Sequence, residues 1–258
     1  GAQFTPFTFK DDWWRLITSA FLHIGIWHLI INMYSLHVIG RDLEVDVGSV
    51  FFLVIYILSA LFAGLFSGYF NLYVVSAGAS GALFGLYGFD FVQILIKHRG
   101  DRQRVRKVAI NFVVYLIVIT AIGTQANFDN AGHYGGLTAG VLMSISFIAL
   151  RTTASKTKVL IIGVAGAFLA FSCYVLMPRS KVQYFDVFQT FIKTDEVTNR
   201  GMNQDYANDS LLVNELIASA ARWDTVGWSL DSISDLPEEL SSDTSILKQY
   251  LRLKQVEI

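Results

Sequence analysis

Residues 76–88 read SAGASGALFGLYG and open a segment that stays apolar up to Ile96. Glycine weakens a helix but lets a second backbone come close, and small residues four positions apart are typical of tight helix contact in lipid. With about 100° per residue, a helical wheel places three glycines on one narrow stripe, with a serine at its edge and a phenylalanine between them: Gly81, Gly85, Gly88, Ser80 and Phe84. The pattern predicts that another helix packs very closely here, beside a serine hydroxyl.

A second stripe of small residues occurs in residues 131–144, which read AGHYGGLTAGVLMS. Four side chains fall within roughly 60° of one another on a helix there: His133, Gly136, Gly140 and Ser144. If the two stripes face each other, the imidazole of His133 comes close to the hydroxyl of Ser80. A hydroxyl beside an imidazole base is the arrangement that activates serine for acyl transfer. The two stripes therefore predict a nucleophile and base pair.

The composition is that of a membrane protein. Of 258 residues, 53% are hydrophobic and 16% are charged, whereas about 25% are charged in soluble domains. Lys and Arg outnumber Asp and Glu up to residue 178, by 12 to 8, and acidic residues dominate after it, by 13 to 8. The single Cys173 excludes an intrachain disulfide and a cysteine metal cluster within these residues. We expect an all-α, polytopic transmembrane helix bundle with a separate acidic tail, without metal, cofactor or nucleic-acid partner.

Three segments of different character follow one another. Residues 1–20 mix aromatic and charged side chains, which suits an interfacial loop. Residues 21–178 contain six apolar spans, most of them long enough to cross a core of about 30 Å: 24–40, 50–67, 80–96, 108–123, 133–150 and 159–177. Residues 179–258 carry helices with one apolar face. We interpret this tail as a small soluble helical domain with its own core, and the alternative is a groove that binds a partner.

The distribution of basic residues orients the spans, because Lys and Arg gather in cytoplasmic loops. They occupy the connections at 97–107 and 151–158, whereas the loops at 68–79 and 124–132 contain none. With the basic loops inside, the serine and the histidine lie at the same outer depth, and the tail also lies outside. We therefore expect a multi-pass protein of the cell membrane or bacterial inner membrane, with its active site open to the outer side.

The first span brings further polar side chains to the same outer end. His28 and Asn32 are four residues apart and share one helix face, while His23 lies about 140° away from His28. Donors at His28 and Asn32 suit an oxyanion hole, and interhelical hydrogen bonds are the alternative. A zinc-protease site is excluded here, because the two histidines lack the spacing and the acid of the H-E-x-x-H pattern.

Together these motifs resemble those of the rhomboid intramembrane serine proteases. The resemblance covers about residues 6–150 and rests on four motifs: Trp14-Arg15, His23-x4-His28-x3-Asn32, Gly78-x-Ser80-Gly81 and His133-x2-Gly136-x3-Gly140. It implies a six-helix bundle with a serine and histidine dyad in a water-filled cavity open to the outside, plus a seventh helix in one subgroup. The implied substrates are transmembrane proteins in the lipid bilayer.

The resemblance also implies a role for each matched residue. Ser80 is the implied nucleophile and His133 the implied base. His28 and Asn32 would bind the oxyanion with the backbone N–H of Ser80, and Phe84 would pack against the base. The remaining matched positions would support the site: Trp14, Arg15, His23, Gly78, Gly81, Gly136 and Gly140. The family also has a helix before the aromatic-rich segment, so we expect a first helix to be missing from residues 1–258.

Two acidic residues lie near these motifs. Asp129 precedes His133 by four residues and either caps the start of that helix or orients the imidazole. Asp90 lies about 15 Å deeper than Ser80 at helical rise. There we expect a structural hydrogen bond or a side chain that reaches toward Lys97 or Arg99, rather than a catalytic role.

The leading functional hypothesis is a protease that cleaves other membrane proteins near the outer ends of their spanning helices. A catalytically inert relative that binds membrane clients is an alternative, although an intact Ser80 and His133 argue against it. A transporter or channel would need polar or broken segments through the whole bilayer, whereas the polar groups here gather at one end.

Overall fold

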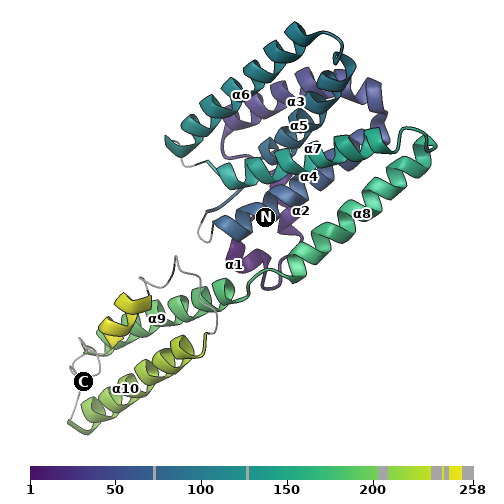
Figure 1. Cartoon of the computed structure of the whole chain (residues 1–258). Coiled ribbons are helices and arrows are strands. Elements are labelled where there is room, and N and C mark those ends of the chain that lie inside the picture. Colours follow the sequence, from purple (N-terminus) through teal and green to yellow (C-terminus); the bar gives the residue numbers. More distant parts are fainter. Residues whose placement is uncertain (72–73, 126–127, 203–208, 234–239, 241–243, 252–258) are drawn as a thin grey trace. The chain divides into compact units, whose positions relative to one another are not determined.

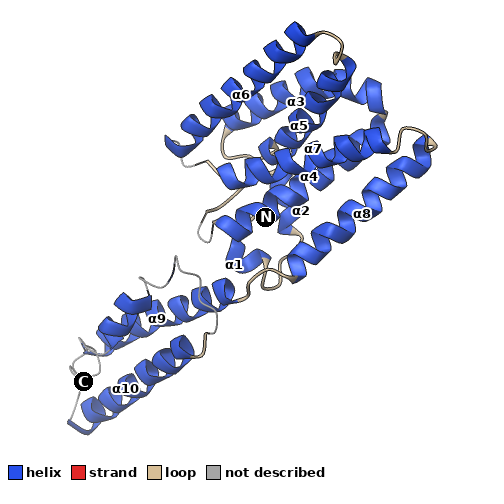
Figure 2. Ribbon diagram, viewed as in Figure 1, coloured by secondary structure: helices blue, strands red, loops and turns tan. Residues whose placement is uncertain are grey.

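The computed structural model describes residues 1–71, 74–125, 128–202, 209–233, 240 and 244–251. Among these residues, Figure 2 shows helices and loops and no strand. The chain divides into two compact units, Gly1–Met177 and Pro178–Ile258. The predicted all-α fold class is confirmed.

Among the described residues, six long helices form most of the first unit: α3 (Ile26–Val47), α4 (Ser49–Phe70), α5 (Ser80–Lys97), α6 (Arg102–Gln125), α7 (Asn130–Ala149) and α8 (Ser155–Val175). They overlap the six ranges predicted as apolar spans. Within the described part of the chain, α4, α6 and α8 are long and apolar enough to cross a membrane by themselves. A fourth span results if α3 is joined to the short helical segment before it, from which it is bent by 93°.

Helix α5 lies at the centre of the first unit (Figure 1) and contacts α3, α4, α6 and α7. Its first half is buried almost throughout. The hydrophobic core forms around it, and Ile55, Leu86 and Phe89 are 0% exposed. A helix surrounded in this way does not need an apolar face toward lipid, which explains why α5 tolerates glycine and polar residues.

The two glycine stripes meet, as their spacing predicts. A Cβ on Gly136 of α7 would overlap the carbonyl of Gly81 on α5, and a Cβ on Gly140 would overlap the carbonyl of Gly85. Gly85 also lies against the side chain of Ser59 on α4, where three helices meet. Because no side chain separates the backbones, the beginnings of α5 and α7 are held side by side.

The segment predicted as an interfacial loop contains three short helical elements: α1 (Thr5–Thr8), α2 (Arg15–Thr18) and the 3₁₀ turn η1 (Ser19–Phe21). This segment packs against two glycines of α4. Phe9 lies on Gly68, and Leu16 lies on Gly64. Leu16 is 5% exposed. The segment is therefore packed against the helix bundle along α4.

Buried hydrogen bonds tie the start of the chain to the loop before α5. Gln3 and Ser76 exchange two backbone hydrogen bonds of 2.9 Å, and the hydroxyl of Ser67 donates to Oε1 of Gln3 at 3.2 Å. The hydroxyl of Thr5 donates to the carbonyl of Asn71, the C-cap of α4, at 2.8 Å. Gln3 and Thr5 are fully buried, where polar groups need such partners.

The second unit contains α9 (Ser180–Met202) and α10 (Asp209–Asp231), and residues 244–251 are also helical. Trp223 is fully buried. Its ring centroid lies 5.4 Å from that of Phe191 and 6.0 Å from that of Tyr250. These contacts give the unit an apolar core of its own. That it is a soluble domain, and that the domain boundary lies at residue 178, stay predictions.

Candidate active site

Ser80 and His133 lie within hydrogen-bond distance of each other. Nε2 of His133 and Oγ of Ser80 are 2.9 Å apart, across the contact between α7 and α5. Ser80 is the first residue of α5, and His133 lies in the first turn of α7. The glycine contacts between these two helices therefore set the position of both side chains. The pair has the geometry of a nucleophile and its general base.

The ring of Phe84 packs against the imidazole of His133. The two rings are stacked, with centroids 4.4 Å apart. Phe84 lies one turn after Ser80 on α5 and is only 6% exposed. The ring of Tyr115, on α6, lies 6.1 Å from that of Phe84. The phenyl ring is thus held from α6 and in turn restricts rotation of the imidazole.

The side chains of His28 and Asn32 face Gly78, two residues before Ser80. A Cβ on Gly78 would lie 2.8 Å from Nε2 of His28 and 3.6 Å from Nδ2 of Asn32. Gly78 has a φ of 132°, which residues with a side chain rarely adopt. Glycine is therefore required both by the backbone conformation and by the space that the two side chains occupy.

The tautomer of His28 follows from its contacts. The backbone N–H of Ile24 donates to Nδ1 of His28 at 3.3 Å, so the neutral ring carries its proton on Nε2. Asn32 uses one proton of Nδ2 for the carbonyl of His28, at 2.9 Å, and has a second one to donate. The ring of His23 meets that of His28 edge to face at 5.3 Å. His28 and Asn32 can both donate to a negative charge that develops beside Gly78.

A cavity of about 570 Å³ connects these groups. Its lining includes all four predicted reactive and oxyanion-binding residues and further polar and apolar ones: Ser80, His133, His28, Asn32, Gly78, Gly81, Phe84, Trp27, Ile31, Tyr115, Phe128 and Asp129. The volume suffices for a peptide segment together with water. Convergence of a nucleophile, a base and two donors in one cavity is what acyl-transfer chemistry requires.

Five residues predicted to support the site do not line this cavity, namely His23, Trp14, Arg15, Gly136 and Gly140. Trp14 is 44% exposed, and Arg15 forms an ion pair of 2.7 Å with Asp12 inside the N-terminal segment. Gly136 and Gly140 lie behind the site, where they allow the contact between α7 and α5. The two glycines thus determine the packing around the site, whereas the ring of Trp14 lies beside that of Trp13.

The sequence alone does not reveal several residues that shape the site. Tyr115 lines the cavity from α6, a position that carries no motif. Asp129, by contrast, takes one of its two predicted roles and caps α7, since its Oδ1 accepts from the backbone N–H of Gly132 at 3.0 Å. The same oxygen accepts from Nδ2 of Asn71 at 2.9 Å. Asn71 could have been noticed only as a polar residue that follows an apolar span.

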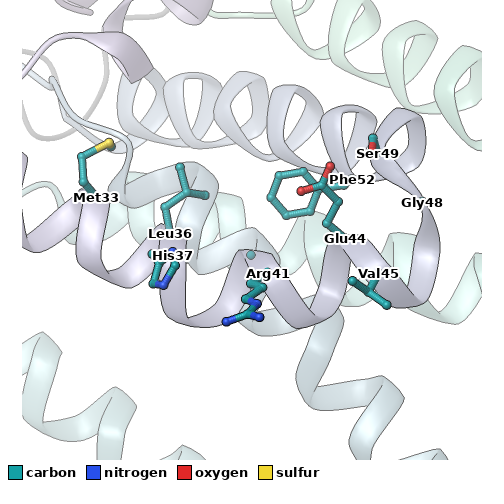
Figure 3. Close-up of a pocket in the computed structure, with 10 residues that line it drawn as sticks. Met33, Leu36, His37, Arg41, Glu44, Val45, Gly48, Ser49 and Phe52 are labelled. Atoms are coloured by element: carbon teal, nitrogen blue, oxygen red, sulfur yellow. The ribbon is translucent and has the colours of Figure 1, made fainter.

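A second cavity of about 700 Å³ lies beside another part of α3 (Figure 3). It is lined by Met33, Leu36, His37, Gly40, Arg41, Glu44, Val45, Gly48, Ser49 and Phe52. It shares no residue with the first cavity and is separate from Ser80 and His133. Among the described residues, no group of three or more His, Cys, Asp and Glu could hold a metal ion.

Known proteins match the part of the chain that builds this site. Residues 10–152 match the rhomboid domain family. RHOMBOID-like protein 1 of Arabidopsis thaliana is 36% identical over 140 residues, which cover 54% of this chain and 36% of the relative. Rhomboid protease GluP of Bacillus subtilis is 33% identical over 179 residues, 67% of this chain and 34% of the relative. Rhomboid protease AarA of Providencia stuartii is 30% identical over 197 residues, 68% of this chain and 70% of the relative.

The helical bundle and its apolar spans define the class of the protein, a multi-pass integral membrane protein. Within that class the chain belongs to the rhomboid family of intramembrane proteases, because the family domain covers more than half of it. The predicted resemblance is thereby confirmed. The chain spans about a third of the length of the first two relatives and 70% of the third.

Proposed function

We propose that the chain is an intramembrane serine endopeptidase, with Ser80 as nucleophile and His133 as general base. The observation that carries this proposal is the 2.9 Å separation between Ser80 Oγ and His133 Nε2. It is supported by the two donors that face Gly78 in the same cavity and by the membership of the chain in a protease family.

The proposed reaction follows from this arrangement. Oγ of Ser80 attacks the carbonyl carbon of the scissile bond while Nε2 of His133 takes its proton. The charge that develops on the carbonyl oxygen is stabilised by His28, Asn32 and the backbone N–H of Ser80. His133 then protonates the leaving amine, and a water molecule that His133 activates hydrolyses the acyl-enzyme. Each turnover thus consumes one water and regenerates the neutral pair.

The proposed substrates are transmembrane proteins, cleaved near the outer ends of their spanning helices. Support comes from the position of the site, since Ser80 and His133 both lie at helix beginnings, while the basic residues Lys97 and Arg151 lie at or just after the opposite ends of those helices. By the preference of basic loops for the cytoplasm, the cavity opens to the outer side. The acidic tail then also lies outside.

The decisive test is labelling of the detergent-solubilised chain with a fluorophosphonate probe, combined with cleavage of a transmembrane reporter. The wild type should be labelled at Ser80, and Ser80→Ala should lose both labelling and cleavage. His133→Ala should lose cleavage as well, and the double variant should be no worse than either single one, because nucleophile and base act as a unit.

Ser172→Ala is the matched control, because this partly buried serine lies on α8, away from the cavity, and donates to the carbonyl of Phe168. It should keep labelling and cleavage. Cleavage at the wild-type rate by Ser80→Ala would refute the proposal. Capture of membrane clients without labelling or cleavage would instead favour a catalytically inert rhomboid-like protein.

A further inference from the structure

Two polar atoms beside the serine and histidine pair are buried and lack a hydrogen-bond partner among the described residues, namely Nδ1 of His133 and Oδ2 of Asp129. Buried polar atoms are normally paired, because leaving them unpaired costs free energy. The two residues lie one turn apart at the start of α7, and both line the cavity of about 570 Å³. One atom can carry a proton and the other is an oxygen of a carboxylate.

The proposed chemistry requires a proton on that nitrogen. Nε2 of His133 must be free to accept the proton of Ser80, so the neutral ring carries its own proton on Nδ1. After the transfer the ring is a cation with two N–H donors. In a site of low dielectric, an anion close to this cation stabilises it more strongly than it would in water.

The carboxylate of Asp129 is fixed in place by its other oxygen. Oδ1 accepts from the backbone N–H of Gly132 at 3.0 Å and from Nδ2 of Asn71 at 2.9 Å. Asn71 is in turn held by the hydroxyl of Thr5, which donates to its carbonyl. Oδ2 lies over Gly132, where a Cβ would be 2.5 Å away from it. The second oxygen of a fixed carboxylate thus lies beside the residue that directly precedes His133.

We propose that Asp129 is a positioning residue whose carboxylate, one helical turn before His133, stabilises the Nδ1–H group and the cationic ring through its negative charge, without a hydrogen bond between Oδ2 and Nδ1 in the structure. This role rests on the proposed protease function and adds to the capping of α7. The proton stays on the imidazole throughout, so Asp129 fixes the tautomer and stabilises the cationic ring without taking up a proton.

Asp129→Asn separates positioning from capping. Asparagine caps helices as well as aspartate does and keeps the acceptor for Gly132 and Asn71, but it offers an N–H group where the anion was. We expect an unchanged Tm in detergent and an unchanged KM for the reporter. The kcat should fall by up to about 10²-fold, which is a smaller loss than the factor of about 10⁴ that the same exchange costs in a Ser-His-Asp triad. The rate of fluorophosphonate labelling of Ser80 should fall in parallel.

Asp129→Ser provides a second variant, because serine also caps helices and carries neither the charge nor a fixed opposing donor. It should keep Tm and lose less kcat than Asp129→Asn. If Asp129→Asn lowers Tm, the kcat of Asp129→Ser tests the proposal instead. A wild-type kcat in whichever of the two variants keeps Tm would overturn the proposal, and so would a fall of kcat that merely follows Tm in both.

Failure of this inference differs from failure of the proposed function. In the first case Ser80 is labelled, Ser80→Ala is inactive and the Asp129 variants turn over like the wild type. In the second case the wild type is not labelled at Ser80, or Ser80→Ala still cleaves.

Discussion

The rings of Phe84 and His133 are parallel, with an angle of 3° between their planes and 4.4 Å between their centroids. The contact joins the helix that carries the proposed nucleophile to the helix that carries the proposed base. It restricts the plane of the imidazole, which must present Nε2 to Ser80. Because a misplacement of about 1 Å can cost on the order of 10²-fold in rate, this ring contact has a measurable role.

Phe84→Leu should lower kcat for a reporter by about 10-fold, because leucine fills much of the space but cannot hold the imidazole plane. Phe91→Leu is the control, since Phe91 lies on the same helix and stacks on Phe112 at 3.9 Å. The control should lower Tm without a specific loss of kcat. If both variants keep the wild-type kcat, the stacked ring does not orient the base.

His28→Ala and Asn32→Ala should each lower kcat by about 10² to 10³-fold, the usual cost of one oxyanion donor. The nucleophile stays in place, so labelling of Ser80 should slow but persist. His37→Ala is the matched control, because this histidine on α3 lines the separate second cavity. Wild-type turnover in both variants would leave His28 and Asn32 as helix-packing residues only.

Gly136→Ala and Gly140→Ala should lower both Tm and activity, because each added methyl group would overlap a backbone carbonyl of α5. Gly163→Ala on α8 is the control, since its Cβ would meet its nearest neighbour, Val54, only at 3.8 Å. Alanine is the better helix former by up to about 1 kcal/mol, so the control should keep or raise Tm. Thermal unfolding in detergent and reporter cleavage measure both effects, and a tolerated Gly136→Ala would contradict the close contact.

The proposed orientation predicts that the tail after residue 178 lies outside and the connection at 97–107 lies inside. A protease added to intact spheroplasts should remove the tail and leave that connection uncut. Rupture of the membrane is the control, after which both segments should be accessible. A tail that is cut only after rupture would reverse the orientation.

Periodicity of the sequence predicts the helices better than their ends. The span predicted at 80–96 is observed as Ser80–Lys97, whereas the one predicted at 24–40 continues to Val47. Hydropathy marks only the part of a helix that faces lipid, and charged residues continue α3 beyond it. The helix ends where Gly48 adopts a φ of 83°. The apolar content of the sequence does not predict this helix end.

The contact between Ser80 and His133 could be predicted, because a helical wheel drawn from the sequence places each of them on or beside a glycine stripe. The structure shows that the two stripes meet. The contacts of Gln3 and Thr5 could not be predicted. They join an irregular segment to loops far along the chain, and such pairs leave no periodic trace. The tautomer of His28 was equally hidden, since it depends on the backbone N–H of Ile24.

The distant pairing of the first residues imposes an order on biosynthesis. Thr5 and Asn71 are 66 positions apart in the sequence, and Ser80 and His133 are 53 positions apart. A chain made from its N-terminus cannot pair Thr5 before α4 is complete, and it carries Ser80 for some time before the base exists. A nascent chain that ends before α7 therefore holds an unactivated hydroxyl. Under the proposed function, neighbouring proteins at the site of insertion would be spared until α7 has been inserted into the membrane.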